Sequence, residues 1–311
     1  MILSKDKLVR LEIMVGELVN LIMVLVGVAF VTLLERKILG YIQIRKGPNK
    51  VGFLGIIQPF SDAVRLFVKN VLFLLSGELG LYLLRPVIGL FLFFCLWIVF
   101  PIMIGGFDFM FGLLFFFCVR RCGVYVLFLY GWSSGSSYSI LGSVRGVAQM
   151  VSYEISLVFI VLRRVFLSHS YDFEGIRYWQ VDYWYVFVLF PLMLIWIVSC
   201  LAETNRSPFD FSEGESELVS GFNVEYGGVG FAFIFMAEYG VIILISYIRV
   251  VLFLGGLLVR LVLGRFIVVV WIWVRGALPR FRYDKLIIIA WCVYLPVSMN
   301  YLIIIYGLVV F

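Results

Sequence analysis

The most acid-rich part of the sequence lies between two apolar stretches, at residues 198–226, and reads VSCLAETNRSPFDFSEGESELVSGFNVEY. It contains a single base, Arg206, and six acids: Glu203, Asp210, Glu213, Glu215, Glu217 and Glu225. Glu213 and Glu217 are four residues apart, so on a helix they would face together and raise each other's pKa. A plain solvated loop is the alternative, but phenylalanine and leucine residues are interleaved with the acids and favour burial. The segment indicates carboxyl groups that take up and release protons.

Four glutamates extend this chemistry into the apolar stretches. Glu154 and Glu238 lie inside long apolar runs, and Glu35 and Glu203 each lie at the end of such a run. A carboxylate at bilayer depth is costly, and burial without a strong partner raises the pKa of a carboxyl group toward physiological pH. A water-linked string of such groups is a route for protons through a protein. The alternative is that each acid only pairs with an arginine.

Other chemistries find little support in the residues. The five cysteines lie in or beside apolar runs, and no spacing among them resembles a zinc or iron–sulfur site. The lone His169 excludes a bis-histidine haem, and no glycine-rich phosphate loop occurs. We therefore predict no metal site, no bis-histidine haem and no nucleotide chemistry on this chain.

The elements that carry these acids are predicted from composition. The chain has 311 residues, of which 63% are hydrophobic and 14% charged, whereas soluble domains have roughly a quarter charged residues. We predict an all-α polytopic integral membrane protein forming a single membrane domain over residues 1–311. Eight runs approach the roughly 20 residues needed to span a bilayer: residues 12–34, 80–104, 109–131, 144–167, 183–201, 229–253, 258–275 and 286–311. Pro191 and Pro296 predict kinks in the fifth and eighth runs.

The connecting segments predict the orientation of the chain in the membrane. Residues 55–70 place apolar side chains on one helical face and polar ones on the other, as in a helix lying along the membrane plane; packing on neighbouring loops is the alternative. Loops one, three, five and seven contain fourteen Lys and Arg residues, against six on the other side. The positive-inside rule places both termini opposite those loops.

Five arginines do not fit this pattern, because they interrupt or end the apolar runs: Arg120, Arg121, Arg163, Arg164 and Arg249. The last three could reach the far membrane interface with their long side chains. Arg120 and Arg121 lie near mid-membrane, and the sequence suggests no counter-ion for either.

Several segments carry a family resemblance: LLERKILGYIQIRKGPNKVG, QPFSDAVRLF, GWSSGSSYSILGSVRGVAQMVSYEIS, LAETNRSPFDFSEGESELVSGFNVEY, FMAEY and WIWVRGALPRFRYDKL. Together they resemble the subunit 1 family of NADH dehydrogenase, respiratory complex I, in its mitochondrially encoded animal form. The resemblance runs from about residue 20 to residue 300. It implies a multi-pass protein of the mitochondrial inner membrane, with both termini on the intermembrane-space side.

The resemblance also implies a function for the acids. It predicts a core subunit that forms the ubiquinone access tunnel and links quinone reduction to proton translocation. Ubiquinone would be a substrate, and flavin and iron–sulfur clusters would sit on partner subunits. By position, the tunnel residues would be Arg36, Arg45, Asp62, Glu203, Arg206, Asp210, Phe222 and Tyr226. The proton and coupling residues would be Glu35, Glu154, Glu213, Glu215, Glu217, Glu225 and Glu238.

Two positions depart from the family pattern. Asn70 stands where the family commonly has an acid, so no carboxylate acts there. Arg120 and Arg121 stand where the family usually has small uncharged residues. Some animal mitochondria read AGA or AGG as serine, and we hypothesise that these two residues are serines in the synthesised protein.

A different class of protein remains as an alternative, a stand-alone ion-coupled transporter. Transporters of that kind tend to show internal repeats with matching interrupted helices, and none is evident in the sequence. A purely structural scaffold would leave the intramembrane glutamates without a role.

Overall fold

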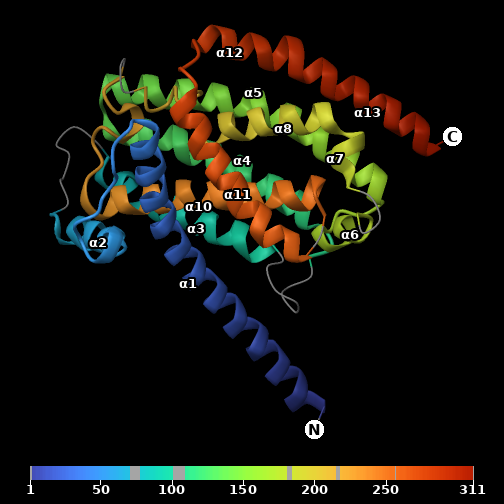
Figure 1. Ribbon diagram of the computed structural model, residues 1–311, viewed down its shortest axis with the longest axis horizontal. Coiled ribbons are helices and arrows are strands. Elements are labelled where there is room, and N and C mark those ends of the chain that lie inside the picture. The colour runs from blue at the N-terminus through green and yellow to red at the C-terminus, as the bar shows by residue number, and fades with distance from the viewer. Residues whose placement is uncertain are drawn as a thin grey trace.

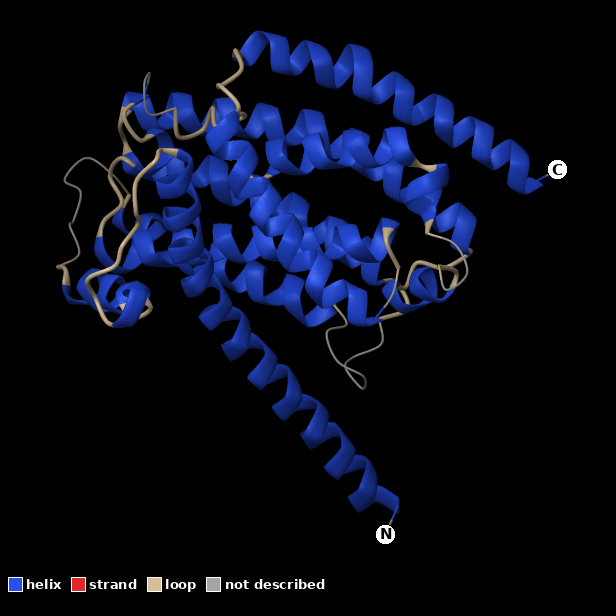
Figure 2. Ribbon diagram, in the orientation of Figure 1, coloured by secondary structure: helices blue, strands red, loops and turns tan. Residues whose placement is uncertain are grey.

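The computed structural model describes residues 2–70, 78–100, 109–180, 184–214, 218–255 and 257–310. These residues form helices joined by loops, and none of them lies in a strand (Figure 2). In the described part of the chain, five helices are long and apolar enough to cross a membrane. The prediction of an all-α polytopic membrane protein is therefore confirmed, while the number of eight spans stays a prediction.

The first half of the chain starts with an unusually long helix. α1 runs over Ile2–Ile42 and is followed by the short turn η1, Phe53–Gly55, and the amphipathic helix α2, Gln58–Val68. α3 (Leu79–Val99), α4 (Gly112–Ser134) and α5 (Ser137–Ser168) follow. In Figure 1 the beginning of α1 projects away from the other helices. Its apolar side chains there, such as Leu18 and Met23, are exposed at 59% and 66%, as expected for a helix that faces lipid or a partner subunit.

The second half returns through the bundle. It contains the short helices α6 (Phe173–Tyr178) and α7 (Tyr185–Val188), then α8 (Phe190–Glu203) and the turn η2 (Gly221–Asn223). α10 (Gly228–Phe253) and α11 (Leu257–Ala277) precede α12 (Tyr283–Ile289), the π-turn η3 (Ala290–Tyr294) and α13 (Leu295–Val310). In Figure 1, α3, α4, α5, α8 and α10 lie side by side, α11 crosses them, and α12–α13 lies along α5.

The two prolines interrupt their helices by different means. Pro191 lies in the first turn of α8, where a proline is tolerated, and the chain breaks just before it at Leu189. Pro296 cannot donate a backbone hydrogen bond and its ring crowds the carbonyl of Cys292, four residues earlier. The helix widens into the π-turn η3 there, which is a common way to accommodate such a mismatch.

Close helix contacts depend on glycine at two positions in particular. A Cβ on Gly131 of α4 would lie 2.0 Å from Oγ of Ser143 on α5. A Cβ on Gly240 of α10 would lie 2.0 Å from the ring of Phe93 on α3. Small residues of this kind let membrane helices approach closely, because packing rather than the hydrophobic effect drives helix association in lipid. These contacts join α4 to α5 and α10 to α3, four of the helices that surround the site described next.

Candidate functional site

An ion pair joins the end of α1 to the end of α11. Glu35 is 6% exposed, and its carboxylate pairs with the guanidinium of Arg275. The hydroxyl of Tyr239 on α10 donates a hydrogen bond of 2.5 Å to Oε2 of Glu35. Three helices distant in sequence thus meet around one buried carboxylate.

Arg206 extends this cluster toward the next acid. Its Nη2 lies 3.3 Å from Oε2 of Glu238, and its Cζ lies 4.4 Å from the centre of the Tyr239 ring. The position of Arg206 follows from the end of α8: Thr204 donates both its amide and its hydroxyl to the carbonyl of Cys200, and Asn205 then turns with φ 50°. This turn directs the segment after α8 across the face of α10.

The neighbouring acids raise the pKa of Arg206 above its ordinary value. Burial acts against the charged form and lowers it, but Tyr239, Glu238, Glu213 and Glu35 together outweigh that effect. Arg206 is therefore a fixed positive charge within a group of acids.

A second pair of arginine–glutamate contacts lies between α4, α5 and α8. Nε of Arg120 donates a 2.6 Å hydrogen bond to Oε1 of Glu203, and both side chains are buried. Nε of Arg121 lies 3.8 Å from Oε2 of Glu154, although Arg121 is 62% exposed. The expectation that neither arginine has a counter-ion is wrong for these contacts, because the fold brings α8 and α5 beside α4, which sequence separation conceals.

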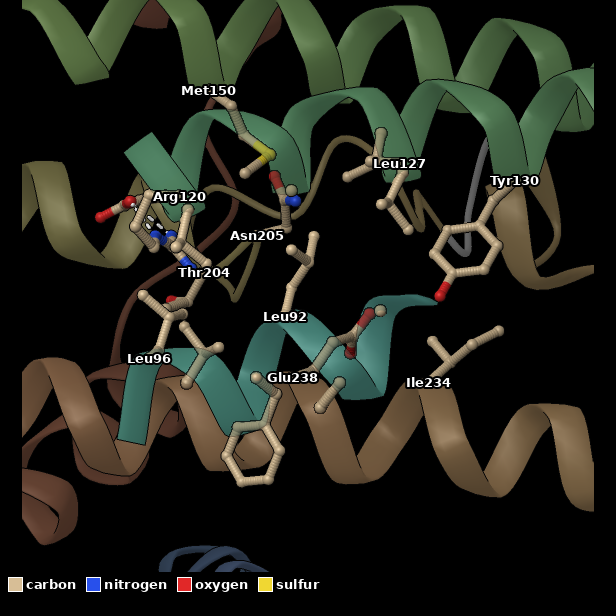
Figure 3. Close-up of a pocket in the computed structure, with 18 of the residues that line it drawn as sticks. Leu92, Leu96, Arg120, Leu127, Tyr130, Met150, Thr204, Asn205, Ile234 and Glu238 are labelled. Atoms are coloured by element: carbon tan, nitrogen blue, oxygen red, sulfur yellow. Dashed lines mark hydrogen bonds and ion pairs between the residues drawn. The ribbon is translucent and has the colours of Figure 1, made fainter. Parts of the chain in front are cut away.

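A cavity of about 130 Å³ is lined by residues of α3, α4, α5, α10 and the end of α8, among them Arg120, Glu203 and Glu238. In Figure 3 the carboxyl group of Glu238 enters the cavity from α10, and the hydroxyl of Tyr130 enters from α4. Arg120 lies at the other end of the cavity from Tyr130. Apolar side chains such as Leu92 and Met150 form most of the wall. The cavity has room for several water molecules beside Glu203 and Glu238.

A smaller cavity of about 30 Å³ adjoins the first pair. Glu35, Arg206, Tyr239 and Arg275 line it together with apolar residues of α10 and α11. Arg206 thus contacts Glu238 of the larger cavity and lines the smaller one.

The described part of the acidic segment is folded against the bundle. The amide of Glu213 donates to Oδ1 of Asp210 at 3.3 Å, and Nδ2 of Asn223 donates to Oε1 of Glu213 at 3.3 Å. Burial raises the pKa of Asp210, an effect opposed by Arg206 and Arg280, and burial likewise raises the pKa of Glu213. Glu215 and Glu217 lie outside the described residues, so the predicted pairing of Glu213 with Glu217 stays a prediction.

The end of the same segment packs in an aromatic group. Tyr226 stacks on Tyr82 with ring centres 4.5 Å apart, and its hydroxyl lies 3.0 Å from Oγ of Ser133. Burial raises the pKa of Tyr226 to about 12. Phe222 lies 5.7 Å from the ring of Tyr130 and forms part of the cavity wall. The backbone carbonyl of Glu225 accepts a hydrogen bond from Tyr82.

The remaining predicted residues lie apart from this group. Arg36 pairs with Asp62 at 2.7 Å, which ties the end of α1 to α2. Arg45 is exposed and donates to Gln43 only two residues away. The structure therefore brings together Glu35, Glu154, Glu203, Arg206 and Glu238, and does not bring Arg45 to them.

Several residues of the site were missed from the sequence. Arg275, Tyr239, Gln149 and Tyr130 belong to the site but are not among the residues that the sequence predicts. Arg85, which the sequence does not predict to be buried, lies inside α3 and is 1% exposed. A polar residue at the end of an apolar run was the signal for Arg275, whereas Tyr130 and Gln149 look like ordinary helix residues.

These features define a class of protein: a multi-pass helical membrane protein with a series of buried acids, arginines and tyrosines through its interior. Among the described residues, no three His, Cys, Asp or Glu side chains are grouped to hold a metal ion. A family model described as NADH dehydrogenase matches residues 16–306. The chain belongs to the NADH dehydrogenase family.

Individual relatives agree along almost the whole length. The chain is 53% identical over 301 residues to NADH-ubiquinone oxidoreductase chain 1 of Anopheles gambiae, covering 96% of each chain. The protein of the same name from Locusta migratoria is 49% identical over 297 residues, with 94% of each chain covered. The one from Paracentrotus lividus is 44% identical over 291 residues, with 90% covered. The predicted resemblance is confirmed, and with it the prediction that the chain is a subunit of an NADH dehydrogenase enzyme.

Proposed function

We propose that this chain is a core membrane subunit of a proton-translocating NADH:ubiquinone oxidoreductase in the mitochondrial inner membrane of an animal. In this proposal it forms part of the ubiquinone access tunnel and couples quinone reduction to proton movement. The observation that carries the proposal is the series Arg275, Glu35, Tyr239, Arg206 and Glu238, which continues across the 130 Å³ cavity to Glu203.

The series is suited to pass on a change of charge. Glu35 contacts Tyr239, whose ring lies against Arg206, and Arg206 pairs with Glu238, so a proton gained by one of these acids changes the field at the other. Glu35 is held from two sides, whereas Glu154 has one carboxylate oxygen with no hydrogen-bond partner among the described residues. A change of charge near Arg206 would therefore weaken the ion pair between Arg206 and Glu238. A weaker ion pair would favour proton movement through the cavity.

The tunnel is proposed to open between α1, α2 and α10. The rings of Phe30 and Phe60 lie 6.0 Å apart and those of Phe67 and Phe233 lie 6.4 Å apart, giving an apolar rim suited to an isoprenoid tail. Arg36 and Asp62 lie beside this rim. The ubiquinone headgroup, which gains electrons and protons on reduction, would act on Arg206 and Asp210. Redox cofactors would be held by partner subunits.

The orientation in the membrane is part of the proposal. α2 lies at the opposite end of the bundle from α6 and the C-terminus (Figure 1). The excess of Lys and Arg in the loops on the α2 side supports a matrix location for that end. The electron-transfer subunits would dock there, and both termini would face the intermembrane space.

A glutamate exchange in the assembled enzyme tests the proton route. Glu154→Gln keeps the size of the side chain and removes its charge, so protons pumped per NADH oxidised are expected to fall while the chain stays in the complex. Glu174→Gln is the matched control, because Glu174 pairs with Arg177 in α6, outside the cavity. A normal proton-to-electron ratio in Glu154→Gln and Glu238→Gln would overturn the route. A photoreactive ubiquinone analogue that labels none of α1, α2 and residues 203–210 would overturn the tunnel.

Purification separates this proposal from the stand-alone transporter. A large assembly containing flavin and iron–sulfur clusters is expected; an active chain purified alone would support the transporter.

A further inference from the structure

We infer that Gln149 is a positioning residue that holds the segment carrying Glu203 and Arg206 in place. The inference rests on the proposed function, because it concerns how those two charged residues keep their alignment. Gln149 lies on α5 and is 0% exposed.

The amide group of Gln149 connects the two ends of this segment. Its Nε2 donates to the carbonyl of Ala202 at 2.7 Å and to the carbonyl of Phe209 at 2.7 Å. Ala202 lies in the last turn of α8, and its carbonyl also accepts the amide of Asn205 at 3.2 Å. Six residues, 203–208, lie between the two anchored carbonyls. One side chain thus fixes both the start and the end of a short loop.

The charged residues of this loop point to two different helices. Glu203 pairs with Arg120 of α4, and Arg206 pairs with Glu238 of α10. Local hydrogen bonds shape the backbone between them, including the amide of Phe209 donating to the carbonyl of Arg206 at 2.9 Å. Contacts from another part of the chain come from Phe281, whose amide donates to the carbonyl of Pro208 at 3.1 Å and whose ring stacks on Phe209 at 5.5 Å. Without the Gln149 amide, the Ala202 and Phe209 carbonyls would keep only local backbone donors, from Asn205 and Phe211. They would lose their common link to α5, so Glu203 and Arg206 would both shift relative to the helices that they face.

The chain offers a matched control at the other end of the bundle. Gln180 is 1% exposed, and its Nε2 donates to the carbonyls of Ile176 at 3.2 Å and Val251 at 2.7 Å. Gln180 therefore bridges two carbonyls as Gln149 does, but it lies beside α6 and the end of α10. Replacing either glutamine by methionine preserves length and removes both hydrogen bonds.

The experiment compares Gln149→Met and Gln180→Met in the assembled enzyme. NADH oxidation with an artificial acceptor that does not use the quinone measures the amount of intact enzyme. Relative to that rate, Gln149→Met is expected to lower ubiquinone reduction about tenfold and to lower the proton-to-electron ratio. Gln180→Met is expected to leave both values unchanged. Equal losses in the two variants, or none in Gln149→Met, would overturn the inference.

A second variant, Gln149→Glu, tests the positioning role even if Gln149→Met fails to assemble. In Gln149→Glu, a protonated carboxyl group donates one hydrogen bond to a carbonyl, whereas a carboxylate donates none and repels both. The ratio of its activity to that of the unaltered enzyme is therefore expected to fall as pH rises, and a ratio independent of pH would refute a positioning role. Measuring both enzymes at each pH cancels the titration of the charged residues on the surrounding elements, Arg120, Glu154, Glu203, Arg206, Asp210 and Arg280.

The outcome is separable from that of the proposed function. If Glu154→Gln and Glu238→Gln lower the proton-to-electron ratio but Gln149→Met does not, the proton route stands and only the positioning role fails. If Gln149→Met, Glu154→Gln and Glu238→Gln all leave the proton-to-electron ratio unchanged, the proton route itself fails.

Discussion

The guanidinium of Arg206 contacts two consecutive residues of α10, the carboxylate of Glu238 at 3.3 Å and the ring of Tyr239 at 4.4 Å. The side chains of consecutive residues on a helix point about 100° apart. One guanidinium can therefore contact both side chains only if it lies across the helix surface. Tyr239 in turn donates to Glu35. Arg206 is thus the link between the Glu35 cluster and the cavity that contains Glu238.

Replacing Arg206 tests whether its charge or its planar shape matters. Arg206→Lys keeps the charge but loses the planar group that lies over Tyr239, and we expect ubiquinone reduction to fall roughly fivefold. Arg206→Met leaves Glu238 without its cation, and we expect a loss of roughly tenfold or more, moderated because Glu238 is 27% exposed. The rates are to be measured as kcat and KM for a ubiquinone analogue. Equal effects of the two variants would show that the charge is unimportant.

Tyr239→Phe isolates the hydrogen bond to Glu35. The ring beneath Arg206 is retained, but Glu35 loses one donor and keeps Arg275. A hydrogen bond to a charged group contributes about 1.5–3 kcal/mol, so ubiquinone reduction is expected to fall by about tenfold to a hundredfold if the full effect is expressed in the rate. Tyr247→Phe, on the same helix but packed against Trp97 and Phe100, serves as the control. An unchanged rate in Tyr239→Phe would remove this residue from the series.

Two glycines of α4 give a matched test of helix packing. Gly131→Ala would place a Cβ 2.0 Å from Oγ of Ser143 and 2.8 Å from the carbonyl of Ser139, whereas a Cβ on Gly123 meets nothing within 4 Å. Alanine favours a helix over glycine by about 1 kcal/mol at either position, so only the contact with α5 differs. We expect Gly131→Ala to reduce the amount of assembled enzyme and its melting temperature, and Gly123→Ala to reduce neither. The opposite order would show that the α4–α5 contact tolerates separation.

Asp210 gives the acidic segment a pH-dependent stability. Because burial raises its pKa in the folded chain, the folded form binds the proton more tightly than the unfolded form. Its contribution is fully present below the unfolded pKa and is lost as pH rises through the folded pKa. Hydrogen-exchange protection of residues 203–214 is therefore expected to fall over that range, and to fall less in Asp210→Asn. Asp284→Asn, at an exposed pair with Arg282, is the control and should match the unaltered protein.

Peptide mass spectrometry decides the chemical identity of the unusual arginines. For Arg120 and Arg121, we expect serine masses if AGA or AGG codons encode them; arginine masses would end that hypothesis. The structure adds Arg85 and Arg249, which are 1% and 5% exposed and have guanidinium nitrogens without a hydrogen-bond partner in the described part of the chain. Arg163 and Arg164 differ from them, because their guanidinium groups lie over the rings of Tyr301 and Tyr185. Buried unpaired charge is costly. By contrast, Ser156, Ser199 and Ser246 in the same bundle each donate to a carbonyl three residues earlier. We therefore expect serine masses at Arg85 and Arg249 as well if AGA or AGG codons encode them.

Composition and the local pattern of apolar residues were sufficient to predict the class of fold. Long apolar runs must become helices in lipid, since each backbone amide and carbonyl needs a partner within its own segment. The acids Glu35, Glu154, Glu203 and Glu238 were identifiable for the same reason, because a carboxyl group inside such a run is costly wherever the helix packs. Motifs around them were enough for the family resemblance.

Only the tertiary structure decided which cation meets which acid. Glu35 and Arg275 are 240 residues apart in the chain, and Arg120 and Glu203 are 83 apart. A helical pattern determines which face a residue occupies but not which helix that face contacts, since many packings bury the same apolar surface equally well in lipid. The sharing of Arg206 between Glu238 and Tyr239, and the bridge made by Gln149, depend on that packing.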